Sequence, residues 1–173
     1  MKIYKIGIIG CGGIAKKMAA TLGKMKEVQR YAVASRNQEK AQAFANEWGF
    51  EKAYGSYEEL ANDPQVDLIY IATPHAMHYN NARMCIEKGK PVLCEKAFTA
   101  NARQAEELLS FAHEKKVSIT EAIWTRYMPL SLTIQDLLKK GVIGTPYTLS
   151  ANLSYPISDK ERIIRPELAG GAL

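Results

Sequence analysis

The chain has 173 residues, a net charge of +5, 47% hydrophobic and 24% charged residues, a composition typical of a globular protein with its own core. Its basic residues are scattered rather than gathered with aromatic ones, which disfavours a nucleic-acid surface. The three cysteines lack metal-like spacing, and we expect them to be reduced. With no membrane-length apolar run and no signal-peptide region, we expect a cytoplasmic protein without membrane association.

The first predicted strand, residues 2–9, runs directly into a cluster of glycines. The cluster reads Gly10-x-Gly12-x-x-Ala15, which matches the dinucleotide fingerprint with its permitted final alanine. Gly10 would make the tight turn, Gly12 would let a pyrophosphate approach the backbone, and Ala15 would let helix and strand pack closely. The N-terminus of the next helix would face the phosphates. An ordinary glycine-rich turn explains the same residues, so this motif alone leaves both interpretations open.

Strand and helix patterns alternate from the glycine turn to residue 122. We predict strands at 2–9, 29–34, 66–72, 91–94 and 117–122, with a helical pattern after each of the first four. Asn37 and Ser56 are in position to cap two of these helices. The strand at 66–72 is almost continuously apolar, as expected when both of its faces are covered. The alternation predicts an α/β fold with right-handed βαβ units and a doubly wound parallel sheet.

The pattern changes after residue 122. A helix is predicted from Leu130 to Gly141, and apolar residues alternate with polar ones over 145–154, as in a half-exposed strand. A single helix and a single strand cannot bury their apolar faces. We therefore predict a dinucleotide-binding domain over 1–122 and the incomplete start of a second domain over 123–173.

The residues of chemical interest follow the predicted strands. In a parallel sheet ligands bind at the carboxyl ends of the strands. Those ends carry the glycine turn and every polar cluster of interest, at 10–12, 35–36, 73–75, 95–96 and 121–122. An ordinary glycine-rich turn would not produce this agreement, so the sequence predicts a dinucleotide site along one edge of the sheet.

The end of the second strand indicates which dinucleotide binds. An Asp or Glu usually holds the free ribose 2′-hydroxyl of NAD at this point, and this chain has Ser35 and Arg36 instead. A hydroxyl and a guanidinium suit a 2′-phosphate, with Lys40 nearby. The sequence favours NADP(H), with NAD(H) as the alternative. A solvated arginine at a helix start is the simpler explanation of Arg36.

Two histidines follow the central strand, after Thr73-Pro74. His75 and His78 have no Cys, Asp or Glu at a helpful spacing, so no metal site is predicted. Contacts to the ribose and nicotinamide of a cofactor are one interpretation of Thr73, His75 and His78. A simple helix cap is the other.

Two further strand ends carry candidate chemistry. Lys96 can polarise a carbonyl or hydroxyl during hydride transfer, and the adjacent Glu95 can position it. Glu-Lys pairs are also common on plain surfaces. Trp124 and Arg126, which follow the last strand, are suited to the wall of a small polar substrate pocket. A packed hinge between domains is an equal interpretation of these two residues.

Taken together, these residues resemble the Gfo/Idh/MocA oxidoreductases. The matching runs are Gly10-Cys11-Gly12-Gly13-Ile14-Ala15, Ala72-Thr73-Pro74-His75 with His78, Glu95-Lys96, and Glu121-Ala122-Ile123-Trp124-Thr125-Arg126. Within the family, the chain is similar to the branch of dimeric dihydrodiol dehydrogenases and NADP-linked D-xylose dehydrogenases. The last of these runs is the most specific.

The resemblance implies an N-terminal Rossmann domain for NADP(H) and a C-terminal α/β domain whose open sheet covers the substrate and often forms a dimer interface. It implies that Lys96 is the catalytic lysine and that the substrate is a sugar, polyol or cyclic diol. From their place after the last strand, we expect Trp124 and Arg126 to lie near that substrate. The complete protein would be a homodimer or a larger oligomer. The expected cofactor-binding residues are Gly10, Gly12, Gly13, Ile14, Ser35, Arg36, Thr73, His75, His78, Glu95 and Lys96.

The chain departs from the family pattern at two places. Ala97 stands where the family usually has Pro. The final run, residues 170–173, resembles the start of the family segment that continues to the catalytic Asp and then a Tyr or His. We therefore expect a truncated oxidoreductase that binds cofactor weakly and has little or no activity. The alternatives are a non-enzymatic NAD(P)-binding sensor on the same fold and a Rossmann methyltransferase, which Ser35-Arg36 disfavours.

Overall fold

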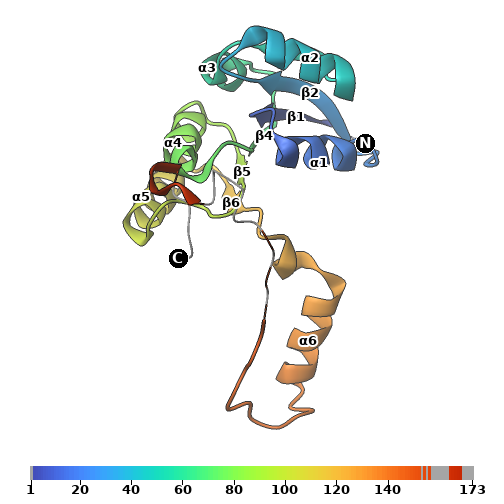
Figure 1. Cartoon of the computed structure of the whole chain (residues 1–173), viewed down its shortest axis with the longest axis vertical. Helices are drawn as coiled ribbons and strands as arrows, with labels where there is room; N and C mark the ends of the chain where they lie inside the picture. The colour runs from blue at the N-terminus through green and yellow to red at the C-terminus, as the bar shows by residue number, and fades with distance from the viewer. Residues whose placement is uncertain (1, 153, 155, 157–163, 169–173) are drawn as a thin grey trace.

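The structure, a computed structural model, describes residues 2–152, 154, 156 and 164–168. Its centre is a six-stranded sheet in the order β3-β2-β1-β4-β5-β6, with every neighbouring pair parallel (Figure 1). The strands are β1 (Tyr4–Ile9), β2 (Val28–Ala34), β3 (Lys52–Tyr54), β4 (Leu68–Ile71), β5 (Val92–Cys94) and β6 (Ile119–Glu121). The strand order reverses between β1 and β4, which confirms the predicted doubly wound α/β fold.

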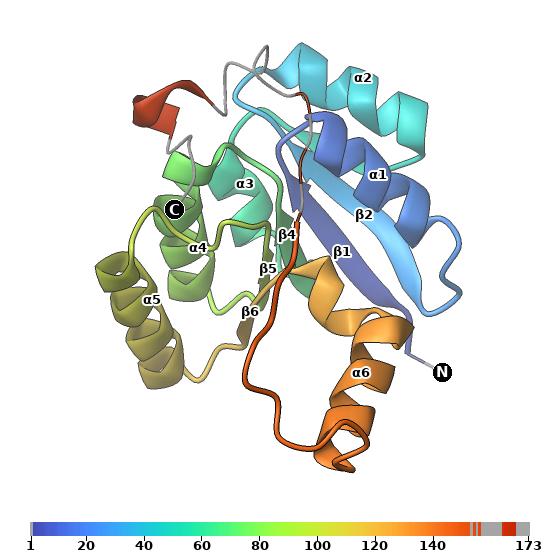
Figure 2. The same ribbon diagram turned by 60° about the horizontal axis from the view of Figure 1, so that its bottom comes forward.

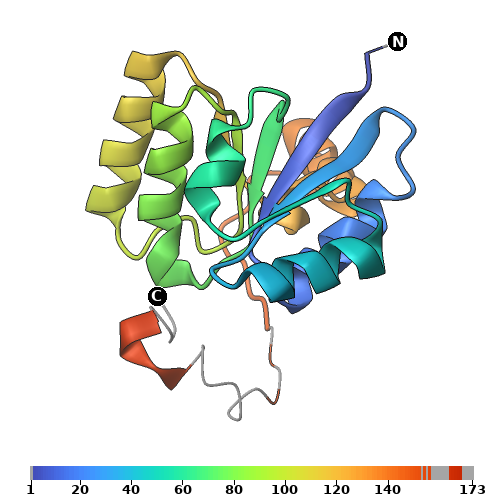
Figure 3. The same ribbon diagram turned by 90° about the horizontal axis from the view of Figure 1, so that it is seen from above.

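Helices cover both faces of the sheet (Figures 2 and 3). The helices are α1 (Gly13–Leu22), α2 (Gln38–Trp48), α3 (Tyr57–Asn62), α4 (His78–Glu87) and α5 (Ala102–Lys115). One apolar cluster joins α1 and α2 to the sheet through buried residues such as Ala19 and Phe44. The other joins α3, α4 and α5 to the opposite face through residues such as Ile86 and Leu108. Burial on both faces explains the nearly continuous apolar character of the central strand.

The predicted helix caps form. The Asn37 side chain accepts a hydrogen bond from Lys40 N–H at 2.7 Å, and Ser56 accepts one from Glu59 N–H at 3.2 Å. Gly49 ends α2 in the left-handed conformation, with φ of 69°, where glycine carries no steric penalty. These local signals fix where the helices begin and end, and so where the strand ends emerge.

The segment after β6 leaves the sheet. A short 3-10 helix η2 (Trp124–Tyr127) leads into α6 (Pro129–Lys139), which stands away from the sheet in Figure 1. The predicted strand over 145–154 is not formed in its described residues, because no neighbouring strand there supplies hydrogen-bond partners. The final run at 170–173 lies outside the described residues. Another 3-10 helix, η3 (Pro166–Leu168), lies against η1 (His75–Met77). Within the described part of the chain, no helix has the length and apolar character needed to cross a membrane.

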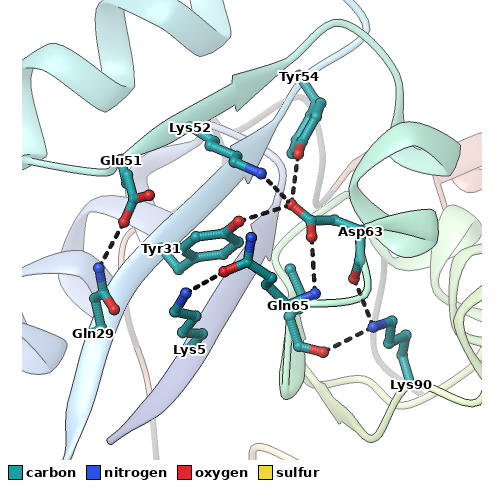
Figure 4. Close-up of polar contacts among 10 residues, drawn as sticks. Lys5, Gln29, Tyr31, Glu51, Lys52, Tyr54, Asp63, Gln65 and Lys90 are labelled. Atoms are coloured by element: carbon teal, nitrogen blue, oxygen red, sulfur yellow. Dashed lines mark hydrogen bonds and ion pairs between the residues drawn. The ribbon is translucent and has the colours of Figure 1, made fainter.

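A buried carboxylate, Asp63, joins the end of α3 to strands β2 and β3 (Figure 4). It accepts hydrogen bonds from the hydroxyls of Tyr54 at 2.6 Å and Tyr31 at 3.1 Å, and pairs with Lys52 Nζ at 2.9 Å. Lys90 Nζ donates to the Asp63 carbonyl at 2.6 Å. Asp63 therefore holds the connection between α3 and β4 through both its side chain and its backbone carbonyl.

The ionised form of Asp63 is strongly favoured. Burial by itself would raise the pKa of this carboxyl, but hydrogen bonds from Tyr54, the Gln65 N–H and Lys52 outweigh burial and hold the pKa well below its usual range. A carboxylate whose pKa is lower in the folded than in the unfolded chain adds stability that is complete above the unfolded-state pKa and is lost as the pH falls. Asp63 therefore stabilises the fold at neutral pH and less so in acid.

We expect Asp63→Asn to lower the free energy of unfolding at pH 7 by about 2–4 kcal/mol, because it weakens several charge-assisted hydrogen bonds to a buried group. Urea denaturation measures this difference. The difference between wild type and variant should shrink as the pH falls below about 4, where the wild-type carboxyl loses its advantage. An equal difference at pH 3 and pH 7 would show that the charge contributes nothing.

Candidate functional site

A cavity of about 590 Å³ opens at the carboxyl edge of the sheet, within the size range of cofactor pockets. Four connections form its wall: the turn from β1 into α1, the segment from β4 into η1, the segment after β5, and η2. The lining residues are Gly12, Gly13, Ile14, Lys17, Ala72, Thr73, Pro74, His75, Glu95, Lys96 and Trp124. Residues predicted from separate strand ends therefore meet in one cavity.

The two glycines of the motif, Gly10 and Gly12, have different roles. Gly10 has φ of +102°, and a Cβ there would lie 2.8 Å from the Ala72 carbonyl oxygen, so the fold itself requires glycine. A Cβ on Gly12 would meet no atom within 4 Å. Gly12 is therefore not required by internal packing, and its missing side chain leaves space on the cavity side.

The start of α1 supplies free donors beside that space. The first helical hydrogen bond runs from Lys16 N–H to the Gly12 carbonyl at 3.1 Å, so the N–H groups of Gly13 and Ile14 precede the helical ladder. Unpaired N–H groups and the positive end of the helix dipole favour an anion. The open backbone at Gly12 and these donors fit the pyrophosphate of a dinucleotide.

Lys17 is a lining residue that the sequence analysis missed. It lies one turn into α1, on the same side as Gly13 and Ile14, and it faces the cavity. Its neighbour Lys16 instead pairs with Glu47 at 3.1 Å. The helical spacing of Lys17 from Gly13 is the signal that would have identified it.

Ser35 and Arg36 lie at the end of β2, outside the lining of the cavity. Burial raises the pKa of the Tyr57 hydroxyl, and the nearby Arg36 charge opposes this rise. Burial likewise raises the pKa of the Cys11 thiol, and the charge of Lys40 opposes it. The cationic side chains of Arg36 and Lys40 therefore lie near the glycine turn. The ribose that carries the 2′-phosphate of NADP would lie there.

Glu95 is held at two points where β5 ends. One carboxylate oxygen accepts a hydrogen bond from the Tyr70 hydroxyl, and the other accepts one from Lys96 N–H at 3.2 Å. Lys96 itself is exposed and lines the cavity, and its peptide bond to Ala97 is cis. This arrangement brings an ammonium and a fixed carboxylate to the cavity wall.

His78 does not line the cavity, contrary to the predicted nicotinamide contact. Its ring is fully buried, with Nδ1 2.7 Å from the Ala97 carbonyl oxygen and Nε2 2.9 Å from that of Thr73. Asn81 also donates to the Thr73 hydroxyl at 3.0 Å. The ring therefore supports two connections of the cavity wall from behind, while His75 lines the cavity.

The two predicted substrate residues separate in the structure. Trp124 lines the cavity, whereas Arg126 does not. Both lie on η2, whose residues are exposed, and only Trp124 is among the lining residues. The residues that the structure describes include no cluster of metal-ligating side chains.

The fold and the cavity define a dinucleotide-binding Rossmann protein, with a glycine turn at the point where the strand order reverses. Residues 4–122 match the GFO_IDH_MocA family, an oxidoreductase family with an NAD-binding Rossmann fold. The chain belongs to this family, as the resemblance of its motifs implied.

Curated relatives extend this assignment. The chain is 40% identical over 190 residues to D-xylose 1-dehydrogenase (NADP(+)) from Hypocrea jecorina, covering 97% of this chain and 49% of the relative. It is 40% identical over 171 residues to trans-1,2-dihydrobenzene-1,2-diol dehydrogenase from Xenopus laevis, covering 98% and 52%. The chain thus spans about half the length of these relatives.

Solved structures show the same fold. An NAD binding oxidoreductase from Klebsiella pneumoniae matches with a TM-score of 0.73 and 35% identity, over 82% of this chain and 40% of that one. A 3-ketoreductase from Actinomadura kijaniata, determined with TDP-benzene and NADP, matches with a TM-score of 0.76 and 29% identity, over 83% and 45%.

We expect Gly12→Val to weaken NADPH binding roughly tenfold or more, because the new side chain fills the space beside the α1 donors. Its effect on the free energy of unfolding should stay within about 1 kcal/mol, since a Cβ at this position meets no atom within 4 Å and the main cost is that of a poorer helix N-cap. Fluorescence titration and urea denaturation measure the two effects. Gly10→Ala is the matched control and should destabilise the fold. Unchanged NADPH affinity in Gly12→Val would remove the glycine turn from the site.

Proposed function

We propose that the chain is the cofactor-binding part of an NADP-dependent oxidoreductase. Such an enzyme passes a hydride between the nicotinamide and the carbinol carbon of a sugar or cyclic diol. The observation that carries the proposal is that Lys96 and Glu95 line the same cavity as Gly12. The turn that would bind phosphate and the lysine that would act as acid or base therefore share one edge of the sheet. The names of the D-xylose and dihydrodiol dehydrogenase relatives support this substrate class.

The dinucleotide would bind along the carboxyl edge. Backbone N–H groups of Gly13 and Ile14 would hold its pyrophosphate, and Lys17 would add a positive charge. Ser35 and Arg36 would receive the 2′-phosphate, which favours NADP(H) over NAD(H). His75 and Thr73 line the cavity and would contact the ribose and nicotinamide. The bound nicotinamide supplies or accepts the hydride.

Lys96 is the proposed catalytic residue. Its ammonium would hold or move a proton at the substrate oxygen and would stabilise negative charge that develops there. Glu95, fixed by two hydrogen bonds, would keep the lysine in place. Trp124 would form one wall for the substrate, and Arg126 would lie beside it on η2.

The chain after residue 122 would begin a second domain that completes the substrate site. The α6 helix supports this proposal, since Leu130, Ile134 and Leu137 are 63%, 48% and 42% exposed. Apolar side chains on one helix normally pack against another element. The complete protein would cover them with its remaining half and would assemble as a homodimer or larger oligomer.

Cofactor preference gives a direct test. We expect this chain to bind NADPH roughly tenfold more tightly than NADH, because a guanidinium pairs well with a phosphate. Arg36→Ala should reduce that ratio towards one while leaving NADH affinity nearly unchanged. Fluorescence titration with both nucleotides measures the ratio. Tighter binding of NADH, or an equal loss for both nucleotides in Arg36→Ala, would contradict the 2′-phosphate assignment.

The catalytic assignment is tested in the complete enzyme. We expect Lys96→Ala to lower kcat by roughly 10²–10⁴, the usual contribution of a general acid or base, with NADPH affinity changed by less than about twofold. Lys88→Ala, which alters an exposed lysine on the far end of α4, is the control and should retain full turnover. Unchanged turnover in Lys96→Ala would sink the assignment. A complete protein that binds NADPH yet turns over no sugar or diol would indicate a sensor instead.

A further inference from the structure

We propose that Tyr70 is a positioning residue of the cofactor cavity. Its hydroxyl fixes the Glu95 carboxylate, and through it the direction from which Lys96 enters the cavity. This inference rests on the proposed function, because it assigns a role to Tyr70 in the same site. Tyr70 lies in the middle of an otherwise apolar strand, where the sequence pattern indicated only core packing.

The position of Tyr70 is set by the sheet. Its backbone pairs with Ile8 on β1 and with Leu93 on β5. Its side chain is 1% exposed and packs in the apolar cluster that contains Ile8, Val33 and Ala72. A ring held on all sides has little freedom to rotate. Its hydroxyl is therefore delivered to one place, the carboxyl end of the neighbouring strand β5.

The hydroxyl is a dependable donor at that place. Burial raises the pKa of Tyr70, and the adjacent Glu95 carboxylate raises it further, so the phenol keeps its proton at neutral pH. Its bond to a carboxylate oxygen belongs to the stronger, charge-assisted class. With the Lys96 N–H on the other oxygen, both oxygens of Glu95 are occupied.

These two bonds connect the interior of the sheet to the cavity wall. Lys96 has a flexible four-carbon stem and is exposed, so its direction depends on the backbone from which it projects. That backbone is held by the Glu95 N–H, which donates to the Ile71 carbonyl at 3.0 Å, and by the Glu95 side chain. Without the Tyr70 hydroxyl, the carboxylate is free to turn towards the ammonium groups of Lys17 or Lys96, which line the same cavity. A carboxylate in that position would repel the cofactor phosphates.

The experiment compares Tyr70→Phe with Tyr31→Phe in this chain. Both remove the hydroxyl of a buried tyrosine that donates to a carboxylate, but the partner of Tyr31 is Asp63, which does not line the cavity. We expect similar falls in Tm for the two variants. Only Tyr70→Phe should lower NADPH affinity, by roughly fivefold or about 1 kcal/mol. Only Tyr70→Phe should shift the Lys96 backbone amide resonance in the ¹⁵N NMR spectrum of the cofactor-free protein.

A double-mutant cycle tests whether Tyr70 acts through Glu95. The loss caused by Tyr70→Phe should disappear when Glu95 is already replaced in Glu95→Ala, because the hydroxyl then has no carboxylate to hold. An undiminished loss in that background would overturn the proposed route. Should Tyr70→Phe fail to fold, the NMR spectrum of the wild-type chain tests the contact between Tyr70 and Glu95. A slowly exchanging Tyr70 hydroxyl proton with a cross-relaxation signal to the Glu95 side chain supports the contact, and its absence overturns it.

The outcomes separate this inference from the proposed function. A wild-type chain that binds no NADPH would remove the proposed function, while the Lys96 amide shift would still test the positioning role. A wild-type chain that binds NADPH, with Tyr70→Phe and Tyr31→Phe alike in affinity and in the Lys96 resonance, would overturn the positioning role alone.

Discussion

The close approach of β1 and β4 at the carboxyl edge is the constraint on which the site depends. Ala72 N–H donates to the Ile9 carbonyl at 2.8 Å. Gly10, which follows Ile9, lies so near the Ala72 carbonyl that no side chain fits between them. This contact places the glycine turn directly against the segment that leaves β4. The helix donors beside Gly12 and the polar group of Thr73 consequently share one cavity.

Two tyrosine–carboxylate contacts illustrate how one chemistry serves the fold and the site. Tyr31 and Asp63 are part of a polar cluster that joins α3 to β2 and β3, so their contact stabilises the fold. Tyr70 and Glu95 meet at the edge where the cavity opens. In the role that we propose, their contact positions Lys96. Glu95 directly follows β5 at the carboxyl edge of the sheet, where ligands bind, whereas Asp63 lies in the connection from α3 to β4.

Periodic and local features of the sequence predicted much of the fold. The alternation of strand and helix patterns indicated the parallel sheet, and Asn37 indicated a helix cap that forms. The strand β3 was missed because it has only three residues and no apolar run. The strand expected over 145–154 was wrong in its described residues, because alternation alone provides no hydrogen-bonding partner. The lining of the cavity was predictable where a local motif is diagnostic, as at Gly12, and not where burial decides, as at His78 and Tyr70.

The central claim is that the glycine turn and Lys96 belong to one NADP-binding cavity. Titrating the ¹⁵N-labelled chain with NADPH and following its backbone amide resonances tests this most directly. Saturable shifts at Gly12, Gly13 and Lys96, with one dissociation constant for all three, are the predicted result, because one bound molecule would reach both ends of the cavity. Shifts confined to another surface, or no saturable shift at any of the three, would contradict it.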